Sequence, residues 1–287
     1  MRFVTYLRRG EARLAIVRGD NYVDVQEAES SLPSTMTDLF AIGPQGMQRV
    51  ADATTRGKIV ERGSVKLLAP VPRPEKVICI GLNYADHAAE SGQAIPGEPV
   101  VFSKFVTAVR AHEDEVTLPR ASNKVDYEAE LVVILGRGGK NIPVEKAWEH
   151  VAGYTCGHDV SARDWQLQKP GGQWLLGKSF DGFAPFGPEL VTPDEVGDPG
   201  RLNIALRLNG KTMQSSNTQQ LIFTIDKLIA YLSTVCTLQP GDVIFTGTPP
   251  GVGGARKPPV YLQPGDVVEV EIEKIGILRN RFVADAD

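Results

Sequence analysis

The sequence has few cysteines. Among 287 residues there are only 3, Cys79, Cys156 and Cys236, which lie far apart in apolar surroundings. An odd number of separated cysteines argues against a disulfide framework and against a zinc site, and favours buried thiols in a reducing compartment.

Histidines are also few. The sequence holds 4, and these are His87, His112, His150 and His158. They form neither an HxH nor an HExxH spacing, so a zinc site or a facial-triad iron site has little to build on.

Runs of like charge and long apolar stretches are missing. With 31 basic and 35 acidic side chains the formal net charge is −4, and no Lys/Arg run suggests a nucleic acid or a membrane surface as partner. The N-terminal segment MRFVTYLRRGEARLAIV lacks the apolar core of a signal peptide, and no later stretch is long enough to span a bilayer. We therefore expect a cytoplasmic protein that acts on small molecules.

Prolines mark one clear boundary in the chain. In LLAPVPRPEKV, Pro70, Pro72 and Pro74 alternate with other residues and hold the backbone extended. We therefore divide the chain into a small N-terminal α+β domain, residues 1–70, and a larger domain, residues 71–287. In the first, MRFVTYL and ARLAIV predict a hairpin, VDVQEA a third strand, and TMTDLFAIG and QGMQRVADATT two helices.

The part after the prolines is rich in predicted strands. KVICIGL, PVVFSKF, ELVVILG, LNIALRLNG, GDVIFTG and GDVVEVEIEKIG are separated by Gly, Pro or Asn-Gly turn signals. Helical patterns are fewer, the clearest being VEKAWEHV, residues 144–151, and FTIDKLIAYLSTV, residues 223–235. Because the strands do not alternate regularly with helices, we predict an α+β fold with a rolled or sandwiched mixed β core rather than a doubly wound parallel sheet.

Two glutamates stand at the start of one predicted strand. In KVDYEAELVVIL, Glu128 and Glu130 are two residues apart, so on a strand their side chains point to the same face. Like charges about 6–7 Å apart beside an apolar strand repel each other and are costly to desolvate, which a cation between them would offset. The alternative is a solvated strand end whose carboxylates face water.

Asp159 offers a third carboxylate. In GYTCGHDVSARDWQ it follows a short apolar run and precedes a polar stretch, where a strand gives way to a loop. Oxygen-only ligands suit a hard divalent cation, Mg²⁺ or Mn²⁺, and three carboxylates leave about half of an octahedral shell open for water and substrate. The neighbouring His158 points the other way if the strand persists, so we expect it to be structural.

His87 and Glu90 form a candidate catalytic pair. The segment GLNYADHAAESG follows the strand KVICI and predicts a short helix capped by Asn83. His87 and Glu90 then share one face, where the carboxylate orients the imidazole and raises its basicity, as a general base requires. The alternative is an exposed helix pair of little energetic weight. Glycines at both ends, Gly81 and Gly92, would let the segment move as a lid.

Further polar side chains are candidates for substrate contact. Lys178, in WLLGKSFDGF, could serve an anionic substrate or a developing enolate, or could instead extend to solvent. Thr246, Thr248 and backbone N–H groups in FTGTPPGVGG suit a substrate carboxylate, although no GK[ST] marks a phosphate loop. Arg163 and Gln166, in SARDWQ, are candidate substrate contacts, and the polar segment MQSSNT has no role that its chemistry assigns.

Taken in order, these segments resemble the fumarylacetoacetate hydrolase family. The match consists of IGLNYADHAAE, DYEAELVVILG, GHDVSARDWQ, GKSFDGFAPFGP, LNGKTMQSSNT and LQPGDVIFTGTPPGVG, and it runs from about Val77 to the C-terminus. The resemblance implies a mixed β-roll catalytic domain, a homodimer, and bound Mg²⁺ or Mn²⁺. The residue roles that it implies are metal ligands Glu128, Glu130 and Asp159, catalytic His87, Glu90 and Lys178, and substrate contacts Gln166 and Thr248.

The resemblance also implies chemistry on 2-oxo acids. A metal that binds the carboxylate and the 2-oxo oxygen of the substrate would stabilise an enolate. His87, oriented by Glu90, would activate a water that attacks the distal carbonyl of a 2,4-dioxo acid. We therefore predict a metal-dependent hydrolase that cleaves a carbon–carbon bond of an acylpyruvate-type acid and releases pyruvate enolate, which Lys178 helps to neutralise.

Other reactions share this enolate. Oxaloacetate decarboxylation, keto–enol tautomerisation, and isomerase or lyase reactions on a related 2-oxo acid stay open as alternatives. A metal-stabilised binding protein without activity is a further alternative, against which the His87/Glu90 pair argues. Some family members carry arginine where this chain has Leu82, and ESGQAIPGEP differs between members, so we expect substrate choice to reside there.

Overall fold

The computed structural model describes residues 1–55, 57–92 and 94–286. Its N-terminal part contains a small curled set of strands, β1 (Arg2–Arg8), β2 (Glu11–Arg18), β3 (Asn21–Asp24), β4 (Ile59–Glu61) and β5 (Lys66–Leu68). Three helices cover these strands, α1 (Val25–Ala28), α2 (Met36–Ile42) and α3 (Pro44–Thr54). The hairpin and the helix pair are confirmed, whereas the predicted third strand VDVQEA divides between β3 and α1.

The N-terminal strands continue into a sheet of 12 strands. Its other members are β6 (Val77–Gly81), β7 (Val100–Lys104), β8 (Val109–Arg110), β11 (Ala129–Leu135), β12 (Val151–His158), β14 (Ala184–Val191) and β17 (Val243–Phe245). The order is β4-β3-β2-β1-β14-β12-β11-β17-β6-β7, with β5 beside β1 and β8 beside β14. Since β1 pairs with β14, the two predicted domains share a sheet, and the boundary at residue 70 stays a prediction.

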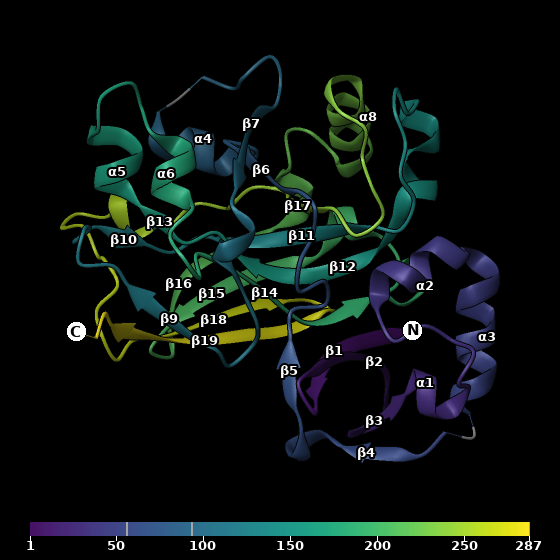
Figure 1. Cartoon of the computed structure of the whole chain (residues 1–287). Coiled ribbons are helices and arrows are strands. Elements are labelled where there is room, and N and C mark those ends of the chain that lie inside the picture. The colour runs from purple at the N-terminus through teal and green to yellow at the C-terminus, as the bar shows by residue number, and fades with distance from the viewer. Residues whose placement is uncertain (56, 93, 287) are drawn as a thin grey trace.

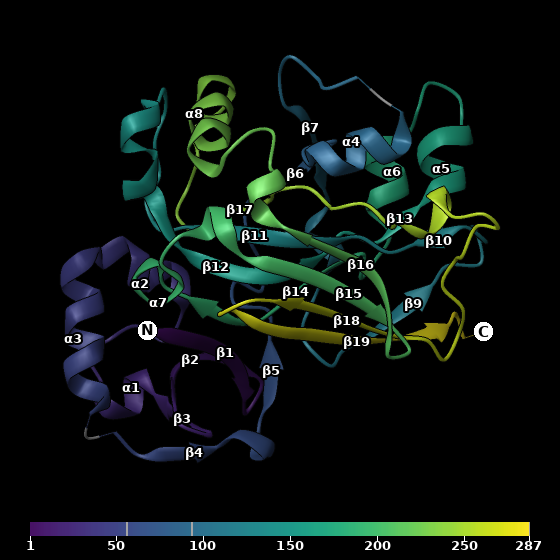
Figure 2. The same ribbon diagram turned by 180° about the vertical axis from the view of Figure 1, so that it is seen from behind.

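A second sheet of 5 strands lies against the first. It runs in the order β16 (Lys211–Asn217), β15 (Asn203–Leu208), β18 (Val267–Ile272), β19 (Gly276–Ala284) and β9 (Glu115–Leu118). A short ladder joins β10 (Val125–Asp126) to β13 (Ser161–Ala162). Every residue of β11 is buried, because β11 and β12 pack on β15, β18 and β19 on one side and are covered by helices on the other (Figures 1 and 2).

Further helices follow in the part of the described chain after β6. They are α4 (Ala85–Ser91), α5 (Arg163–Gln168), α6 (Trp174–Lys178), α7 (Pro193–Val196) and α8 (Ile225–Val235). The 3₁₀ turns are η1 (Arg62–Ser64), η2 (Val106–Ala108), η3 (Val144–His150), η4 (Pro199–Arg201), η5 (Thr218–Gln220) and η6 (Gly253–Ala255).

The predicted α+β class with a mixed, layered β core is confirmed. The helix predicted over residues 144–151 is instead the 3₁₀ segment η3, which ends at His150, and the last predicted residue, Val151, belongs to β12. None of the helices in the described part of the chain has the length and apolar character needed to cross a bilayer.

Candidate metal centre and active site

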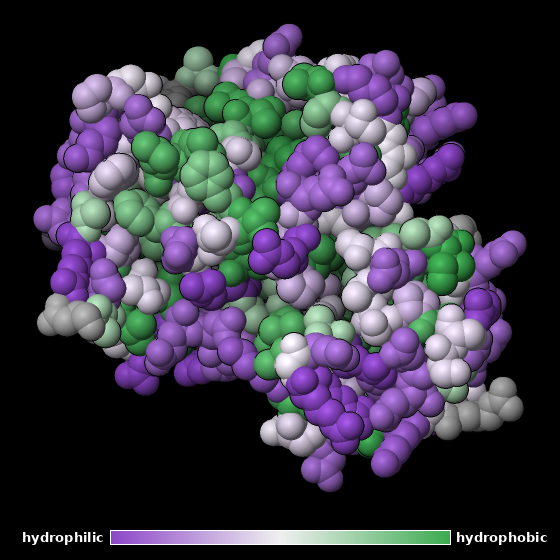
Figure 3. Space-filling model, in the orientation of Figure 1, coloured by the Kyte–Doolittle hydropathy of each residue, from purple (hydrophilic) through white to green (hydrophobic). Residues whose placement is uncertain are grey.

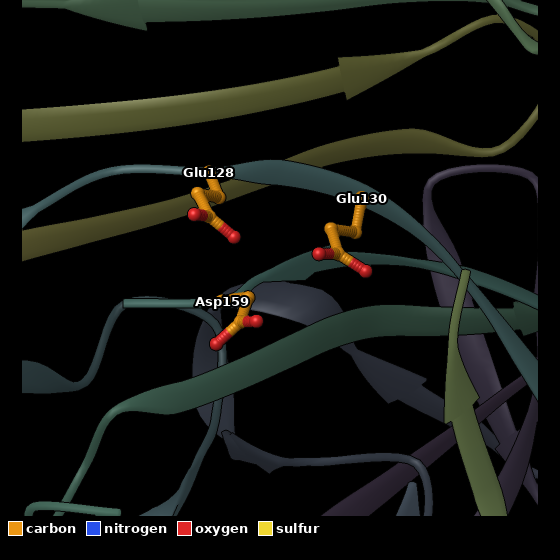
Figure 4. A group of neighbouring side chains, drawn as sticks. All are labelled: Glu128, Glu130 and Asp159. Atoms are coloured by element: carbon orange, nitrogen blue, oxygen red, sulfur yellow. The ribbon is translucent and has the colours of Figure 1, made fainter. Parts of the chain in front are cut away.

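The antiparallel pairing of β11 with β12 brings the predicted metal ligands together. Ala129 pairs with His158, so Glu128, just before β11, lies opposite Asp159, just after β12, and the Asp159 N–H donates a 3.0 Å hydrogen bond to the Glu128 carbonyl. Glu130 follows on the same face of β11. One oxygen from each carboxylate lies within 4.8 Å of the others and all three residues are buried, so the side chains converge on one point (Figure 4).

Cations surround this buried cluster of carboxylates. Lys178 Nζ donates 2.8 Å hydrogen bonds to Glu128 Oε2 and to Asp159 Oδ2. Lys104 Nζ lies 2.5 Å from Asp159 Oδ1, and Arg163 Nη2 lies 2.6 Å from Glu128 Oε1. These pairs offset the cost of desolvating the carboxylates.

The pKa values of the cluster differ according to which charges lie nearest. Burial raises the pKa of Glu130 well above its ordinary value, and the charges of Asp159 and Glu128 raise it further. Burial also favours a higher pKa for Glu128, but the positive charges of Lys178 and Arg163 outweigh it and lower this pKa to about 2. Burial opposes the charge on Lys178, yet Asp159 and Glu128 raise its pKa above the ordinary value.

The cluster fits a hard divalent cation. All its donors are carboxylate oxygens, the ligands that Mg²⁺ and Mn²⁺ prefer. Among the described residues, Asp159 Oδ1 accepts no hydrogen bond of good geometry, although Lys104 Nζ touches it. The backbone N–H of Gly247 donates a 2.7 Å hydrogen bond to Glu130 Oε2 and so fixes that carboxylate without a competing charge.

His87 and Glu90 both lie on α4, as predicted. His87 Nδ1 is 3.3 Å from Glu90 Oε2, and the same oxygen accepts a 3.1 Å hydrogen bond from the Gly251 N–H. With Nδ1 directed at a carboxylate, the imidazole presents Nε2 as the atom that can accept a proton.

The start of α4 differs from the prediction. Tyr84, not Asn83, is the N-cap residue, and its side chain makes no capping hydrogen bond. The amide of Asn83 instead donates to the carbonyls of Thr246 at 2.8 Å and Phe223 at 3.1 Å. Asn83 therefore joins the beginning of α4 to the end of β17.

A pocket of about 410 Å³ opens beside the cluster. The predicted residues that line it are His87, Glu128, Glu130, Arg163, Gln166, Lys178 and Thr248. Asp159 is fully buried behind this lining. Glu90 does not line the pocket itself but contacts His87, which does. Arg163 Nη1 donates to Gln166 Oε1 at 2.9 Å, so the two predicted substrate contacts also touch each other.

In the glycine-rich turn after β17, several backbone N–H groups already donate hydrogen bonds within the protein and are not available to a substrate. These groups donate to the protein's own carboxylates, Gly247 to Glu130, Gly251 to Glu90, and Gly253 and Gly254 to Asp126. The prediction that they bind a substrate carboxylate is therefore wrong at these positions. Thr248 does line the pocket, and its hydroxyl accepts a 2.9 Å hydrogen bond from Gln214 Nε2. Thr246 is buried and bonds the carbonyl of Leu131.

His158 is a buried neighbour of the cluster. Its ring packs edge-on against Phe282 with centroids 5.8 Å apart, and burial lowers its pKa to about 3. A neutral imidazole in an apolar contact fits the structural role expected of it.

Several residues of the site escaped the sequence patterns. Gln214, from the unassigned MQSSNT segment, accepts a hydrogen bond from the Ala129 N–H at 2.8 Å and donates to Thr248. Lys104 lies within a predicted strand. It neutralises the charge of Asp159, and only the fold brings these two residues together. Asp126 stands two residues before Glu128, the same spacing that separates Glu128 from Glu130. This spacing alone did not indicate that Asp126 binds the glycine-rich turn.

Comparisons with known proteins agree with this geometry. A family model described as "Fumarylacetoacetate (FAA) hydrolase C-terminal" matches residues 76–283. "Oxaloacetate tautomerase fahd2, mitochondrial" of Xenopus laevis is 48% identical over 271 residues, which cover 94% of this chain and 85% of that protein.

Two solved structures share the fold. Fumarylacetoacetate hydrolase from psychrophilic Exiguobacterium antarcticum is 37% identical with a TM-score of 0.86, covering 99% of this chain and 100% of that one. Maleylpyruvate hydrolase from Sphingobium sp. SYK-6, in complex with manganese(II) and pyruvate, is 30% identical with a TM-score of 0.84 and covers 100% of both chains.

The predicted cytoplasmic location is wrong on this comparison. The names of the Xenopus laevis relative and of a human relative that is 48% identical over 266 residues, 92% of this chain and 85% of that protein, both include the word mitochondrial. The prediction depended on a missing signal-peptide core and on unpaired cysteines, and neither feature separates the cytoplasm from the mitochondrial interior.

Proposed function

Because the chain belongs to the fumarylacetoacetate hydrolase family, we propose that it is a Mg²⁺- or Mn²⁺-dependent oxaloacetate tautomerase, which interconverts the keto and enol forms of this 2-oxo acid. The observation that carries the proposal is the 48% identity, over 94% of this chain, to a protein named as an oxaloacetate tautomerase. The relatives thus favour the alternative of tautomerisation over the acylpyruvate hydrolysis first predicted from the sequence.

Glu128, Glu130 and Asp159 would hold the metal. When bound, it supplies a Lewis acid that draws electron density from the carboxylate and 2-oxo group of the substrate. Burial of all three ligands keeps water away from these carboxylates, which strengthens every charge interaction at the centre.

His87 is the residue that moves the proton. In the keto-to-enol direction its Nε2 accepts a proton from carbon 3 of the substrate, and in the reverse direction it returns the proton to the same carbon. The 3.3 Å contact of Nδ1 with Glu90 holds the ring in the required orientation.

Lys178 stabilises charge on the oxygen of carbon 2. Its ammonium already bridges Glu128 and Asp159 at 2.8 Å, so it stands beside the ligands and faces the pocket. As negative charge builds on the substrate oxygen, a fixed cation at this place lowers the barrier without reorganisation. Arg163, Gln166 and Thr248 line the same pocket and orient the substrate.

The decisive assay uses oxaloacetate prepared as the enol, with the protein loaded with Mg²⁺ or Mn²⁺. Loss of enol absorbance reports tautomerisation, release of CO₂ and pyruvate reports decarboxylation, and an acylpyruvate in parallel reports hydrolysis. We expect metal-dependent loss of the enol without stoichiometric CO₂. Hydrolysis of the acylpyruvate at a higher kcat/KM than oxaloacetate tautomerisation would overturn the proposal.

Variants separate the catalytic pair from mere binding. His87→Gln is expected to lower kcat about 10²–10⁴-fold, as for loss of a general base, and Glu90→Gln to lower it less. The matched control is Glu145→Gln, an exposed glutamate on η3 outside the pocket, which should leave kcat unchanged. Equal activity of His87→Gln and the control would exclude His87 as the base.

We further propose that the protein is a homodimer, as the family resemblance implies. Strand β7 is the edge of the large sheet, and Val101 on it is 43% exposed. Two further apolar side chains are also exposed, Phe105 just after β7 at 51% and Val235 at the end of α8 at 74%. Figure 3 shows apolar surface gathered around this edge, in the upper middle of the view. Such an edge is usually covered in the native assembly. Sedimentation equilibrium at micromolar concentration should give twice the chain mass, and a monomer there would contradict the proposal.

A further inference from the structure

The pocket beside the carboxylate cluster has two chemically different halves. One half carries the carboxylates and the cations that neutralise them. The other half is formed by large apolar and aromatic side chains, and these are Leu82, Phe102, Leu167, Trp174, Val252 and Tyr261. We call this second half the apolar wall.

The apolar wall starts at the cluster itself. Lys178 Nζ lies 5.1 Å from the centroid of the Phe102 ring, in cation–π contact, while the same ammonium bonds the carboxylates. The Phe102 ring in turn meets Trp174 edge-on, with centroids 5.5 Å apart and an interplanar angle of 71°. The wall therefore extends outward from the reacting end of the pocket.

The backbone makes room for this wall. A Cβ on Gly81 would lie 2.8 Å from the Trp174 ring, so only glycine lets the indole pack at this place. The next residue, Leu82, has φ of 51°, a left-handed conformation that is unusual and strained for a bulky side chain. Strain of this kind persists where the surrounding structure imposes it, and here it holds an apolar side chain at the pocket.

The described residues along the wall leave no permanent positive charge for a second carboxylate. Among the described residues that line the pocket, the Lys and Arg side chains are Lys178 and Arg163. Lys178 bonds the cluster, and Arg163 bonds Asp126 at 2.8 Å and Glu128 at 2.6 Å. A charged substituent lying along the wall would be desolvated without a partner, whereas an apolar one would gain contact.

The pocket is also larger than oxaloacetate requires. Its volume of about 410 Å³ falls within the range of about 300–1,000 Å³ that holds drug-sized ligands. At its rim, Leu167 is 62% exposed, an apolar surface that a longer ligand would cover. Oxaloacetate is short enough for both of its carboxylates to stay in the polar half.

From these observations we infer that the site also tautomerises 2-oxo acids with an aryl or other bulky apolar group on carbon 3, with phenylpyruvate as the simplest member, and that Trp174 and Leu82 determine this specificity. The inference rests on the proposed tautomerase function and names a further substrate class for the same site.

The reaction balances without a co-reactant. In the keto-to-enol direction, the C3–H bond breaks and its proton goes to His87 Nε2, while the electron pair forms the C2–C3 double bond. The carbonyl π pair moves to the oxygen on carbon 2, which receives a proton from water, and the protonated His87 then gives its proton back to water, so no proton is gained or lost. The aryl group takes no part in these steps, and its place against Phe102 and Trp174 contributes binding alone.

The test compares phenylpyruvate with oxaloacetate on the Mn²⁺-loaded protein, by loss of enol absorbance. We expect wild-type protein to accelerate both. Trp174→Ala should raise KM for phenylpyruvate about tenfold, which is about 1.4 kcal/mol, and change KM for oxaloacetate less than about twofold. The matched control is Trp148→Ala, because Trp148 lies on η3, is 44% exposed and is absent from the pocket lining.

A second variant covers the case in which Trp174→Ala does not fold. Leu82→Asn makes the wall polar at a position whose left-handed backbone asparagine adopts more easily than leucine, so its melting temperature should not fall. It should raise KM for phenylpyruvate severalfold more than KM for oxaloacetate.

The outcomes are distinguishable. Acceleration of oxaloacetate but not of phenylpyruvate overturns the inference and leaves the proposed function standing. Acceleration of neither overturns the proposed function. Equal changes of KM for both substrates in Trp174→Ala and in Leu82→Asn would show that the wall serves the fold alone, which also overturns the inference.

Discussion

Replacement of Asp126 by asparagine should destabilise the protein and loosen the glycine-rich turn beside the pocket. Asp126 is fully buried, and its carboxylate accepts hydrogen bonds from the N–H groups of Gly253 at 2.7 Å and Gly254 at 2.8 Å. It also accepts a 2.8 Å hydrogen bond from Arg163 Nε. One side chain thus secures both the turn and the arginine that pairs with Glu128.

The magnitude follows from these contacts. Asparagine keeps one acceptor oxygen, but its NH₂ group replaces the second oxygen and cannot accept a hydrogen bond from a backbone N–H. The N–H that loses its acceptor is then buried and unsatisfied, which costs about 1–3 kcal/mol. Loss of one partner from a buried charge pair costs about 3–5 kcal/mol, and we take the lower end because Arg163 retains Glu128 at 2.6 Å. The lower ends of the two costs add to about 4 kcal/mol, and with an unfolding entropy of about 2.1 cal/mol/K per residue over 287 residues this lowers the melting temperature by about 7 °C.

The measurement is urea unfolding near neutral pH, at one protein concentration for all variants. Asp198→Asn is the matched control, because Asp198 also accepts a backbone hydrogen bond, from Gly200 at 2.9 Å, but its side chain is 63% exposed. The control should cost less than about 1 kcal/mol. If Asp126→Asn lost no more than Asp198→Asn, Asp126 would not secure the turn as described.

Three further outcomes are expected. Glu130→Gln should abolish the metal-dependent rise in melting temperature, which in wild-type protein corresponds to about 2.7 kcal/mol at a free Mn²⁺ concentration of about 100 Kd, and a retained rise in scanning fluorimetry would exclude Glu130 as a ligand. Lys178→Met removes the ammonium that bridges Glu128 and Asp159 and should lower kcat for oxaloacetate about 10²–10³-fold, whereas an unchanged kcat would remove it from the mechanism. Burial lowers the pKa of His112, so the unfolded chain binds the proton more readily, and this contribution to stability is present above the unfolded pKa of about 6.5 and lost as the pH falls. His112→Asn should therefore flatten the decrease in unfolding free energy between about pH 7 and pH 5, and parallel curves would refute this.

Local patterns were sufficient for the elements and for part of the site. Apolar runs bounded by turn signals predicted strands that include β6, β7, β11, β15, β17 and β18, and the apolar spacing of residues 223–235 predicted α8. The pair Glu128 and Glu130 was visible because two-residue spacing on a strand fixes a common face. The His87/Glu90 pair was visible for the equivalent reason on a helix.

The rest of the site depends on contacts between distant segments. Asp159 joins the glutamates only through the register of β11 with β12, which the sequence pattern does not specify. Asp126 meets the turn at Gly253 across 127 positions, and a glycine-rich turn gives no sign of which anion it will bind. Asn83 was assigned as a cap because local propensity favours that role, and tertiary hydrogen bonds took the side chain elsewhere.

The register of β11 with β12 has a consequence for how the chain tolerates insertions and deletions. The carboxylates lie at one end of this antiparallel pair, where Ala129 faces His158, and the connection through residues 136–150 lies at the opposite end, beside Leu135 and Val151. Lengthening that connection leaves the alignment of the carboxylates intact. One residue inserted within either strand would turn a ligand to the opposite face and separate it from the others. Foreign segments or affinity tags therefore belong in the connection, and the strands themselves permit substitution but no change of length.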